Sequence, residues 1–247
     1  MVTGPTGSGK STTLYGTLNI LNTPEKNIIT VEDPVEYRLA GINQVQVNVK
    51  AGLTFAAGLR SILRCDPDIV MIGEIRDRET AQIAVESALT GHLVLSTLHT
   101  NNAPGALSRL TEMGVEPFLT ASAVDCVIAQ RLVRKLCEYC KEPYQATREM
   151  LERLDFPENV VEDWKNISLH RAVGCNRCSG TGYKGRVGIY EIMPVTEAIE
   201  RLIVERKSAD EIMRVAAAEG MITLRQDGLE RVVQGKTSIE EISRVIV

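Results

Sequence analysis

Aromatic residues are scarce in this sequence: one tryptophan, three phenylalanines and six tyrosines make up 4% of its 247 residues. Proteins that grip single-stranded nucleic acid stack bases on aromatic rings and carry excess positive charge. Here 28 basic residues stand against 32 acidic ones, which gives a net charge of −4. Both shortages argue against a dedicated nucleic-acid binder, and we expect no nucleic-acid partner.

Long apolar runs are also missing. The sequence has no stretch of about 18 apolar residues, the length needed to span a membrane. Met1 leads directly into a glycine-rich motif, without the charged and apolar regions of a signal peptide. We therefore expect a cytoplasmic location. The composition, with 44% hydrophobic and 24% charged residues, is that of an ordinary globular protein.

The six cysteines fall in a pattern that favours metal over disulfides in a reducing compartment. Cys137-Glu-Tyr-Cys140 and Cys175-Asn-Arg-Cys178 are two C-x-x-C pairs, and four thiolates at this spacing predict a tetrahedral Zn²⁺ site. Redox-active pairs are the alternative. We expect Cys65 and Cys126, which lie in apolar surroundings, to be core residues.

The first eleven residues contain the phosphate-loop pattern G-x-x-x-x-G-K-[ST]. Its glycines let backbone N–H groups turn toward phosphates, and the following helix adds its positive N-terminal end. Lys10 would reach the β- and γ-phosphates, and the Ser11 hydroxyl would ligate Mg²⁺. The predicted nucleotide-binding residues are Gly4, Pro5, Thr6, Gly7, Ser8, Gly9, Lys10, Ser11 and Thr12.

Two predicted buried strands end in carboxylates. A strand at 28–31 runs into Glu32, which could polarise an attacking water, although a solvated acidic turn fixed by Pro34 is an equal alternative. A second strand at 69–72 is followed by Gly73 and Glu74. The latter resembles the carboxylate that a Walker B strand delivers to Mg²⁺, except that Gly73 intervenes.

Four basic side chains are further candidates. His99 follows a third apolar strand and is placed to sense a γ-phosphate, whereas His92 precedes the same strand. Arg60 and Arg64 lie on a predicted helix, where a solvated face is the more ordinary explanation than phosphate contact.

Four stretches together resemble the secretion ATPase superfamily. GPTGSGKSTT, ITVEDPVEY, DPDIVMIGEIRD and GHLVLSTLHTN match its Walker A, aspartate box, Walker B and histidine box in order. More narrowly they are similar to the assembly ATPases of type IV pili and type II secretion. The resemblance implies a RecA-like P-loop core that hydrolyses Mg-ATP in a homo-hexameric ring. It also implies a position peripheral to the inner (cytoplasmic) membrane, docked on a platform protein.

The resemblance also implies catalytic roles. Glu32 would orient water, Glu74 would hold Mg²⁺ together with Ser11, Lys10 would bind phosphate, and His99 would face the γ-phosphate. The four cysteines favour the assembly subclass, because retraction ATPases lack them.

Family members also use arginines from a preceding N-terminal domain, which this sequence does not contain, so we expect weak hydrolysis by the chain alone. The alternatives are a nucleotide- and zinc-binding fragment with little turnover, and a DNA-transport ATPase.

The alternation of strands and helices predicts an α/β fold with a mainly parallel sheet. We expect an ATPase core at 1–134, a tetracysteine module at 135–185 and a helical C-terminal part at 186–247. In the last part, S/T-x-x-E/Q capping boxes begin at Ser208, Thr223 and Ser238.

Overall fold

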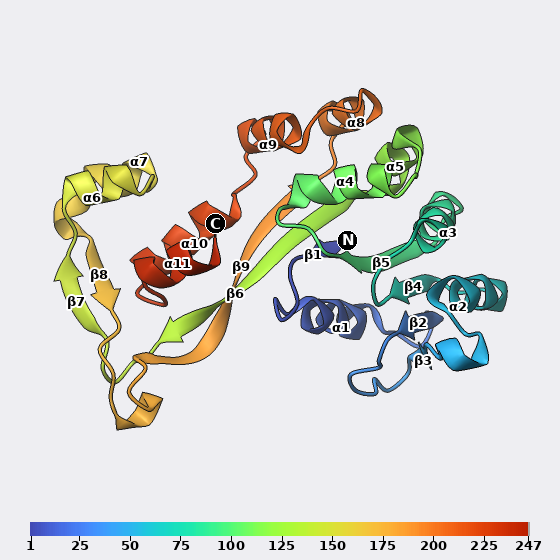
Figure 1. The fold of residues 1–247 in the computed structure, drawn as a ribbon, viewed down its shortest axis with the longest axis horizontal. Coiled ribbons are helices and arrows are strands. Elements are labelled where there is room, and N and C mark those ends of the chain that lie inside the picture. Colours follow the sequence, from blue (N-terminus) through green and yellow to red (C-terminus); the bar gives the residue numbers. More distant parts are fainter. Residues whose placement is uncertain (247) are drawn as a thin grey trace. The chain divides into compact units, whose positions relative to one another are not determined.

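A seven-stranded sheet with flanking helices organises the protein in the computed structural model, which describes residues 1–246 (Figure 1). Its strand order is β3-β2-β4-β5-β1-β6-β9, and β7 and β8 form a separate antiparallel pair. The pairs β3–β2, β2–β4, β4–β5, β5–β1 and β1–β6 are all parallel. This arrangement confirms the predicted α/β class.

The strands and helices have the following bounds. The strands are β1 (Val2–Thr3), β2 (Ile28–Glu32), β3 (Asn43–Gln46), β4 (Ile69–Ile72), β5 (Leu93–Leu98), β6 (Cys126–Leu136), β7 (Glu142–Gln145), β8 (Ser168–Arg171) and β9 (Tyr183–Pro194). The helices are α1 (Lys10–Leu21), α2 (Phe55–Ile62), α3 (Arg78–Leu89), α4 (Ala103–Glu112), α5 (Pro117–Ala123), α6 (Arg148–Arg153), α7 (Glu158–Glu162), α8 (Glu197–Val204), α9 (Ala209–Ala218), α10 (Leu224–Val233) and α11 (Ile239–Val245). Among the described residues, no helix has both the length and the apolar character needed to cross a bilayer.

Parallel pairing places the polar residues that follow each strand at one edge of the sheet. β1 leads into the glycine loop, β2 ends at Glu32, and Glu74 and His99 follow β4 and β5. Because the carboxyl ends of parallel strands meet at the same edge, residues far apart in sequence are brought together there. The short β3 is a parallel edge strand beside β2.

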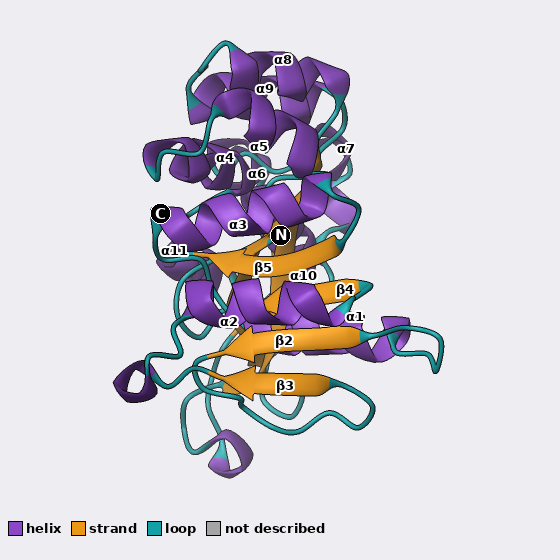
Figure 2. Cartoon of the chain, turned by 90° about the vertical axis from the view of Figure 1, so that its right-hand side faces the viewer, coloured by secondary structure: helices purple, strands orange, loops and turns teal. Residues whose placement is uncertain are grey.

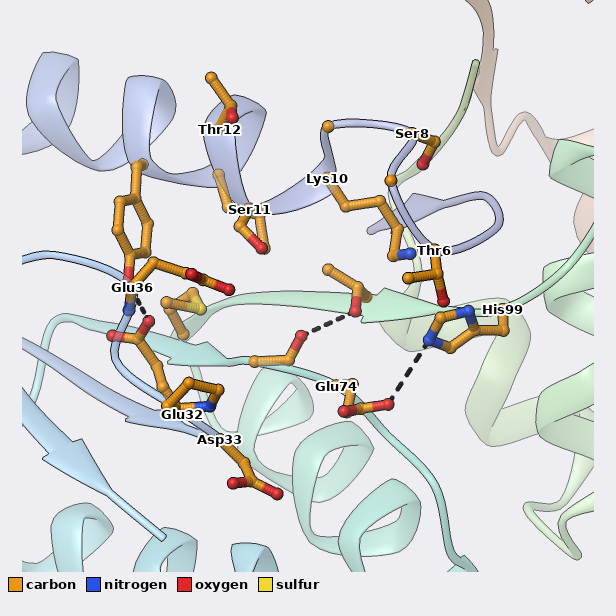
Figure 3. Close-up of a pocket in the computed structure, with 18 of the residues that line it drawn as sticks. Thr6, Ser8, Lys10, Ser11, Thr12, Glu32, Asp33, Glu36, Glu74 and His99 are labelled. Carbon is orange, nitrogen blue, oxygen red and sulfur yellow. Dashed lines mark hydrogen bonds and ion pairs between the residues drawn. The ribbon is translucent and has the colours of Figure 1, made fainter. Parts of the chain in front are cut away.

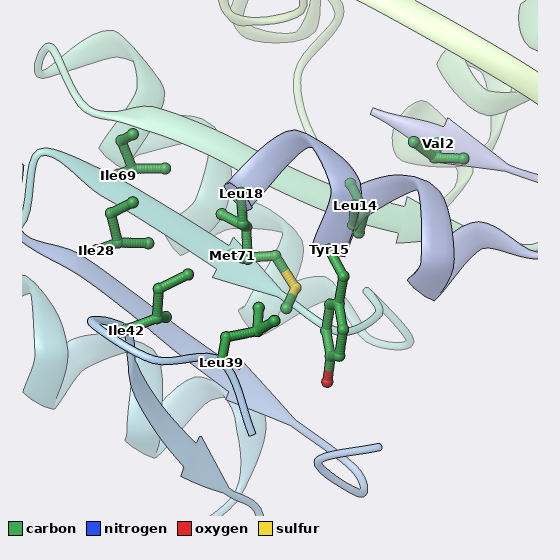
Figure 4. Packing of buried hydrophobic residues seen from close by; sticks show 9 residues of the cluster. All are labelled: Val2, Leu14, Tyr15, Leu18, Ile28, Leu39, Ile42, Ile69 and Met71. Atoms are coloured by element: carbon green, nitrogen blue, oxygen red, sulfur yellow. The ribbon is translucent and has the colours of Figure 1, made fainter. Parts of the chain in front are cut away.

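Helices cover both faces of this sheet (Figure 2). On one face α1 buries Leu14, Tyr15 and Leu18 against strand residues that include Ile28 and Met71 (Figure 4). Burial of a side chain of this size stabilises the fold by about 1.5–3 kcal/mol. On the other face α2 packs closely on β2, where a Cβ on Gly58 would lie 3.1 Å from a methyl of Val31.

The chain divides into two compact units, each made of two segments. One unit comprises residues 1–129 and 192–221, and the other comprises 130–191 and 222–247. The first contains the phosphate loop, and the second contains all four paired cysteines. The three-part division at 134 and 185 stays a prediction, and the two units follow different boundaries.

One of the three predicted capping boxes, at Ser238 in the second unit, forms only in part because the Glu241 carboxylate bonds elsewhere. The boxes at Ser208 and Thr223 form with both reciprocal hydrogen bonds. At the third, Ser238 Oγ accepts the Glu241 N–H, but the Glu241 carboxylate does not return to Ser238. It accepts bonds from the Arg134 backbone N–H and guanidinium and from Arg244 instead. A fully buried carboxylate binds two guanidinium groups more strongly than one helix-end amide.

Replacing Glu241 by Gln is expected to destabilise this unit by about 2–3 kcal/mol at pH 7, because two arginines lose their buried partner. Burial disfavours the charged form, but the hydrogen bonds from Arg244 and Arg134 outweigh it and hold the pKa of Glu241 at about 2. This pKa lies below the value of about 4.3 that a glutamate has in an unfolded chain. The stabilisation by Glu241 is therefore complete above about pH 4.3 and is lost as the pH falls toward 2.

Urea unfolding of the wild-type and Glu241→Gln chains tests this at several pH values. The gap in unfolding free energy should be constant from pH 7 to pH 5 and should narrow below about pH 4. A gap that is absent at pH 7, or that widens on acidification, contradicts the assignment.

Candidate functional site

A cleft of about 560 Å³ opens at the edge of the sheet where β1, β2, β4 and β5 end (Figure 3). Residues 6–12 of the glycine loop and of α1 form one wall. The opposite wall comes from the ends of β2, β4 and β5 and from the segment after β2. This volume is within the usual range of small-molecule sites, about 300–1,000 Å³. All four predicted catalytic residues, Lys10, Glu32, Glu74 and His99, line it.

The glycine loop has the backbone geometry of an anion cradle. Gly7 and Gly9 have positive φ angles of 79° and 89°, which side-chain-bearing residues rarely adopt. α1 begins after Gly9 without a side-chain cap, and the N-terminal end of a helix favours a bound anion. Gly4 and Pro5 do not line the cleft. Their carbonyl oxygens accept hydrogen bonds of 2.8 and 3.1 Å from Lys10 Nζ.

Glu74 lies among cationic and polar neighbours on the opposite wall. It forms an ion pair with Arg76, and one of its carboxylate oxygens is 3.5 Å from His99 Nε2. The Glu74 side chain is only 15% exposed, whereas that of His99 is 49% exposed. The Glu74 carboxylate lies across the cleft from the Ser11 hydroxyl. Together the two groups offer oxygen ligands, the type that Mg²⁺ prefers.

Gly73, which interrupts the usual Walker B pattern, has a packing reason. Its N–H donates to the Val31 carbonyl at 2.8 Å, and a Cβ there would lie 3.3 Å from Glu32 Cα. Its own carbonyl accepts the Thr97 hydroxyl at 2.7 Å. The glycine therefore lets the end of β4 lie close to β2, which fixes Glu74 relative to Glu32.

Glu32 and Glu36 differ sharply in their surroundings. Glu32 is 3% exposed, and its carboxylate accepts hydrogen bonds from Tyr15 Oη, Thr30 Oγ1 at 2.6 Å and Gln44 Nε2 at 3.1 Å. Glu36 is exposed, lines the cleft and extends its carboxylate toward the side where Ser11 lies (Figure 3). The carboxylate that can reach a bound ligand without breaking protein hydrogen bonds is that of Glu36.

The remaining basic candidates lie outside the cleft. His92 Nδ1 lies 3.0 Å from the Ser87 carbonyl oxygen and 3.2 Å from Thr90 Oγ1 at the end of α3. Arg60 pairs with Glu79, and Arg64 is exposed away from the lining. These three side chains therefore have no contact with the site.

Three polar residues that line the cleft, Tyr15, Glu36 and Arg76, were not among the predicted site residues. A signal was present for each. Tyr15 is four residues after Ser11 and so shares its helix face, Glu36 is the second glutamate of the aspartate box, and Arg76 lies two residues after Glu74. Arg76 Nη1 also lies 3.9 Å from an Asp33 carboxylate oxygen, so this arginine bridges two acidic strand ends.

The four paired cysteines form a second candidate site, in the other unit. Their sulfur atoms all lie within 4.8 Å of one another. The Sγ atoms of Cys137 and Cys175 are 3.9 Å apart, and those of Cys140 and Cys178 are 3.8 Å apart. Four sulfurs about 2.3 Å from a tetrahedral zinc ion would be separated by about 3.8 Å. The side chains present therefore fit Zn²⁺.

Glycines allow the second cysteine pair to fold tightly. A Cβ on Gly174 would lie 2.4 Å from the Gly180 carbonyl oxygen, and one on Gly182 would lie 2.6 Å from Ala172 Cβ. The backbone N–H groups of Cys175 and Gly182 both donate to Cys178 Sγ at 3.2 Å. Hydrogen bonds of this kind orient the ligands of metal sites.

The expectation that Cys65 is a core residue is wrong. This cysteine is exposed, because a 3₁₀ turn after α2 directs it outward, and Cys126 is only partly buried.

Comparison with known proteins identifies the family. The chain matches the family described as Type II/IV secretion system protein over residues 1–244. It is 54% identical over 242 residues to the type IV pilus assembly ATPase PilB of Thermus thermophilus, covering 98% of this chain and 27% of that protein. It is 53% identical over 245 residues to the type II secretion system ATPase E of Vibrio cholerae, covering 99% and 48%. The chain thus spans between about a quarter and a half of these curated relatives.

Solved structures extend the comparison to the fold. The crystal structure of the pilus retraction motor PilT with bound ADP is 30% identical, with a TM-score of 0.72 over 98% of this chain and 59% of that one. The ATPase DotB of Legionella pneumophila, 24% identical with a TM-score of 0.68, covers 98% and 58% and shows the shared fold alone. These matches confirm the resemblance that the four motifs indicated.

The cysteine cluster predicts one zinc ion per chain. Cys140→Ser removes one of four ligands and is expected to abolish stoichiometric zinc and to lower the melting temperature of the second unit, because metal binding is coupled to folding there. Cys65→Ser, which changes an exposed cysteine outside the cluster, should keep both. Metal content by elemental analysis and thermal unfolding give the answer. Equal zinc in both variants contradicts a four-cysteine site.

Proposed function

This chain belongs to the type II/IV secretion system protein family, and we propose that it is the ATP-hydrolysing core of a motor that assembles type IV pili or type II secretion pseudopili. The observation that carries the proposal is the cleft in which the phosphate loop faces Glu36, Glu74 and His99. Two relatives at 53–54% identity are ATPases, which supports the same reaction.

The residues of the loop would hold the nucleotide. The N–H groups at the start of α1 would bind phosphate oxygens, and Lys10 would leave the carbonyls of Gly4 and Pro5 to bind the terminal phosphates. Ser11 and Glu74 are the groups that would hold Mg²⁺, which when bound neutralises developing phosphate charge. The ADP bound to PilT supports a nucleotide in this cleft.

Glu36 is our choice for the carboxylate that orients the attacking water, in place of Glu32. A residue in this role must contact water in front of the γ-phosphate, and Glu36 is exposed to the cleft. Glu32 would have to give up hydrogen bonds to Tyr15, Thr30 or Gln44 first. A buried polar group left without its partner costs about 1–3 kcal/mol.

His99 and Arg76 supply positive charge on the Glu74 side of the cleft. In the resting chain both are associated with the Glu74 carboxylate. His99 is half exposed and would face a γ-phosphate that reaches past Lys10. Transition-state charge would be stabilised further by arginines from a partner surface, as in other phosphoryl-transfer enzymes.

We place the motor in a homo-hexamer that is cytoplasmic and peripheral to the inner membrane, working on a membrane platform protein. The family resemblance and the pilus and secretion functions of the relatives support this setting. The four-cysteine cluster, whose geometry fits zinc, supports the assembly subclass in particular.

Lys10→Ala is expected to weaken nucleotide binding by at least about tenfold, because the loop loses the ammonium group that would bind the terminal phosphates. Titration with a fluorescent ADP analogue in the presence of Mg²⁺ measures this. Lys50→Ala, an exposed lysine outside the cleft, is the matched control and should bind normally. Unchanged binding in Lys10→Ala would remove the basis for a nucleotide site.

Glu36→Gln is expected to lower kcat about 100-fold with little change in nucleotide affinity, since general-base groups contribute about 10²–10⁴-fold. Glu32→Gln should reduce kcat less and should mainly lower the melting temperature, because its role is a buried hydrogen-bond acceptor. Steady-state ATPase assays and thermal unfolding of the two variants separate the roles. The reverse pattern returns the catalytic role to Glu32.

A further inference from the structure

Tyr15 is a buried side chain whose hydroxyl reaches the edge of the cleft. The residue is 1% exposed and lies on α1, one helical turn after Ser11. Its Oη donates to a carboxylate oxygen of Glu32 and accepts the backbone N–H of Glu36 at 3.3 Å. One hydroxyl thus joins the helix of the phosphate loop to the segment that carries Glu36.

The ring of Tyr15 makes a second contact with the same segment. It packs edge-on against Tyr37, with ring centroids 4.6 Å apart and planes at 82°. Edge-to-face pairs of this kind contribute beyond simple area burial. Residues 36 and 37 are therefore held by the hydroxyl and by the ring of one tyrosine.

Glu32 gives that hydroxyl a fixed partner. Its other carboxylate oxygen accepts from Thr30 Oγ1 at 2.6 Å and from Gln44 Nε2 at 3.1 Å. Donors from α1, β2 and β3 thus hold the carboxylate in a single orientation. A buried, fully bonded network of this kind is rigid.

The phenol keeps its proton throughout the working pH range. Burial, followed by the hydrogen bond to Glu32, raises the pKa of Tyr15 well above its ordinary value. With its proton directed at Glu32, the oxygen presents its lone pairs to the Glu36 N–H. The direction of both hydrogen bonds is therefore fixed.

We propose that Tyr15 is a positioning residue for hydrolysis, which, anchored on Glu32, holds the Glu36 segment so that its carboxylate faces the phosphate loop. The inference rests on the proposed function in one respect: Glu36 acts on the attacking water. Tyr15 itself acts only through Glu36. Because a misplacement of about 1 Å can cost about 100-fold in rate, one hydroxyl is sufficient to matter.

Tyr15→Phe is the direct test, since it keeps the ring against Tyr37 and removes only the hydroxyl. We expect kcat to fall about tenfold while the affinity for ADP stays within about twofold. In a Glu36→Gln background the same change should cause no further loss, because the residue it positions is gone. Ser87→Ala removes a buried hydroxyl on α3 that bonds the Ile83 carbonyl oxygen and does not line the cleft, and is the control for general destabilisation.

A readout that does not need turnover accompanies the rates. Amide hydrogen exchange at Glu36 should be slow in the wild-type chain and should accelerate in Tyr15→Phe, but not in Ser87→Ala. A Glu36 amide that exchanges in the wild-type chain as fast as an unprotected amide overturns the proposal, even if Tyr15→Phe does not fold. So does a kcat loss that adds fully to that of Glu36→Gln, or a Tyr15→Phe chain with the wild-type kcat.

The proposed function can fail separately. A wild-type chain that binds no nucleotide counts against the ATPase assignment, and a Glu36→Gln chain as active as the wild type counts against the role of Glu36. Protection of the Glu36 amide by the Tyr15 hydroxyl would in that case still be measured by exchange.

Discussion

Parallel pairing of β1, β2, β4 and β5 is the constraint on which the cleft depends. Each of these strands is short, and each ends at the same edge of the sheet, where the chain must leave the hydrogen-bonded ladder. Residues that leave a buried strand are free to be polar, so this edge collects Glu36, Glu74 and His99 opposite the phosphate loop. The grouping of these residues is thus a consequence of strand register.

The two glutamates of the aspartate box illustrate how one short segment divides its work. Glu32, the last residue of β2, is enclosed and bonded by Tyr15, Thr30 and Gln44, whereas Glu36 is exposed in the loop beyond it. A buried acceptor that orders its surroundings and an exposed carboxylate that reaches a ligand need opposite environments. Four residues of chain supply both.

The fold class, most of the cleft and the cysteine cluster were predictable from local sequence. A phosphate loop, apolar strands that end in acidic residues and C-x-x-C pairs each specify their geometry over a few residues. The predictions that failed depended on contacts between residues distant in the sequence. The burial of Glu32 depends on Gln44 of an edge strand, and Glu241 left its capping box for Arg134, 107 residues away. Cys65 is exposed because of one 3₁₀ turn. No pattern of neighbouring residues encodes these partners.

We propose Glu36, held by Tyr15, as the carboxylate in front of the γ-phosphate. A crystal structure with Mg²⁺ and a non-hydrolysable ATP analogue is the decisive measurement. We expect a water between Glu36 and the γ-phosphate, with Glu32 still bonded to Tyr15. A Glu32 carboxylate turned out of its network and bonded to that water would contradict it.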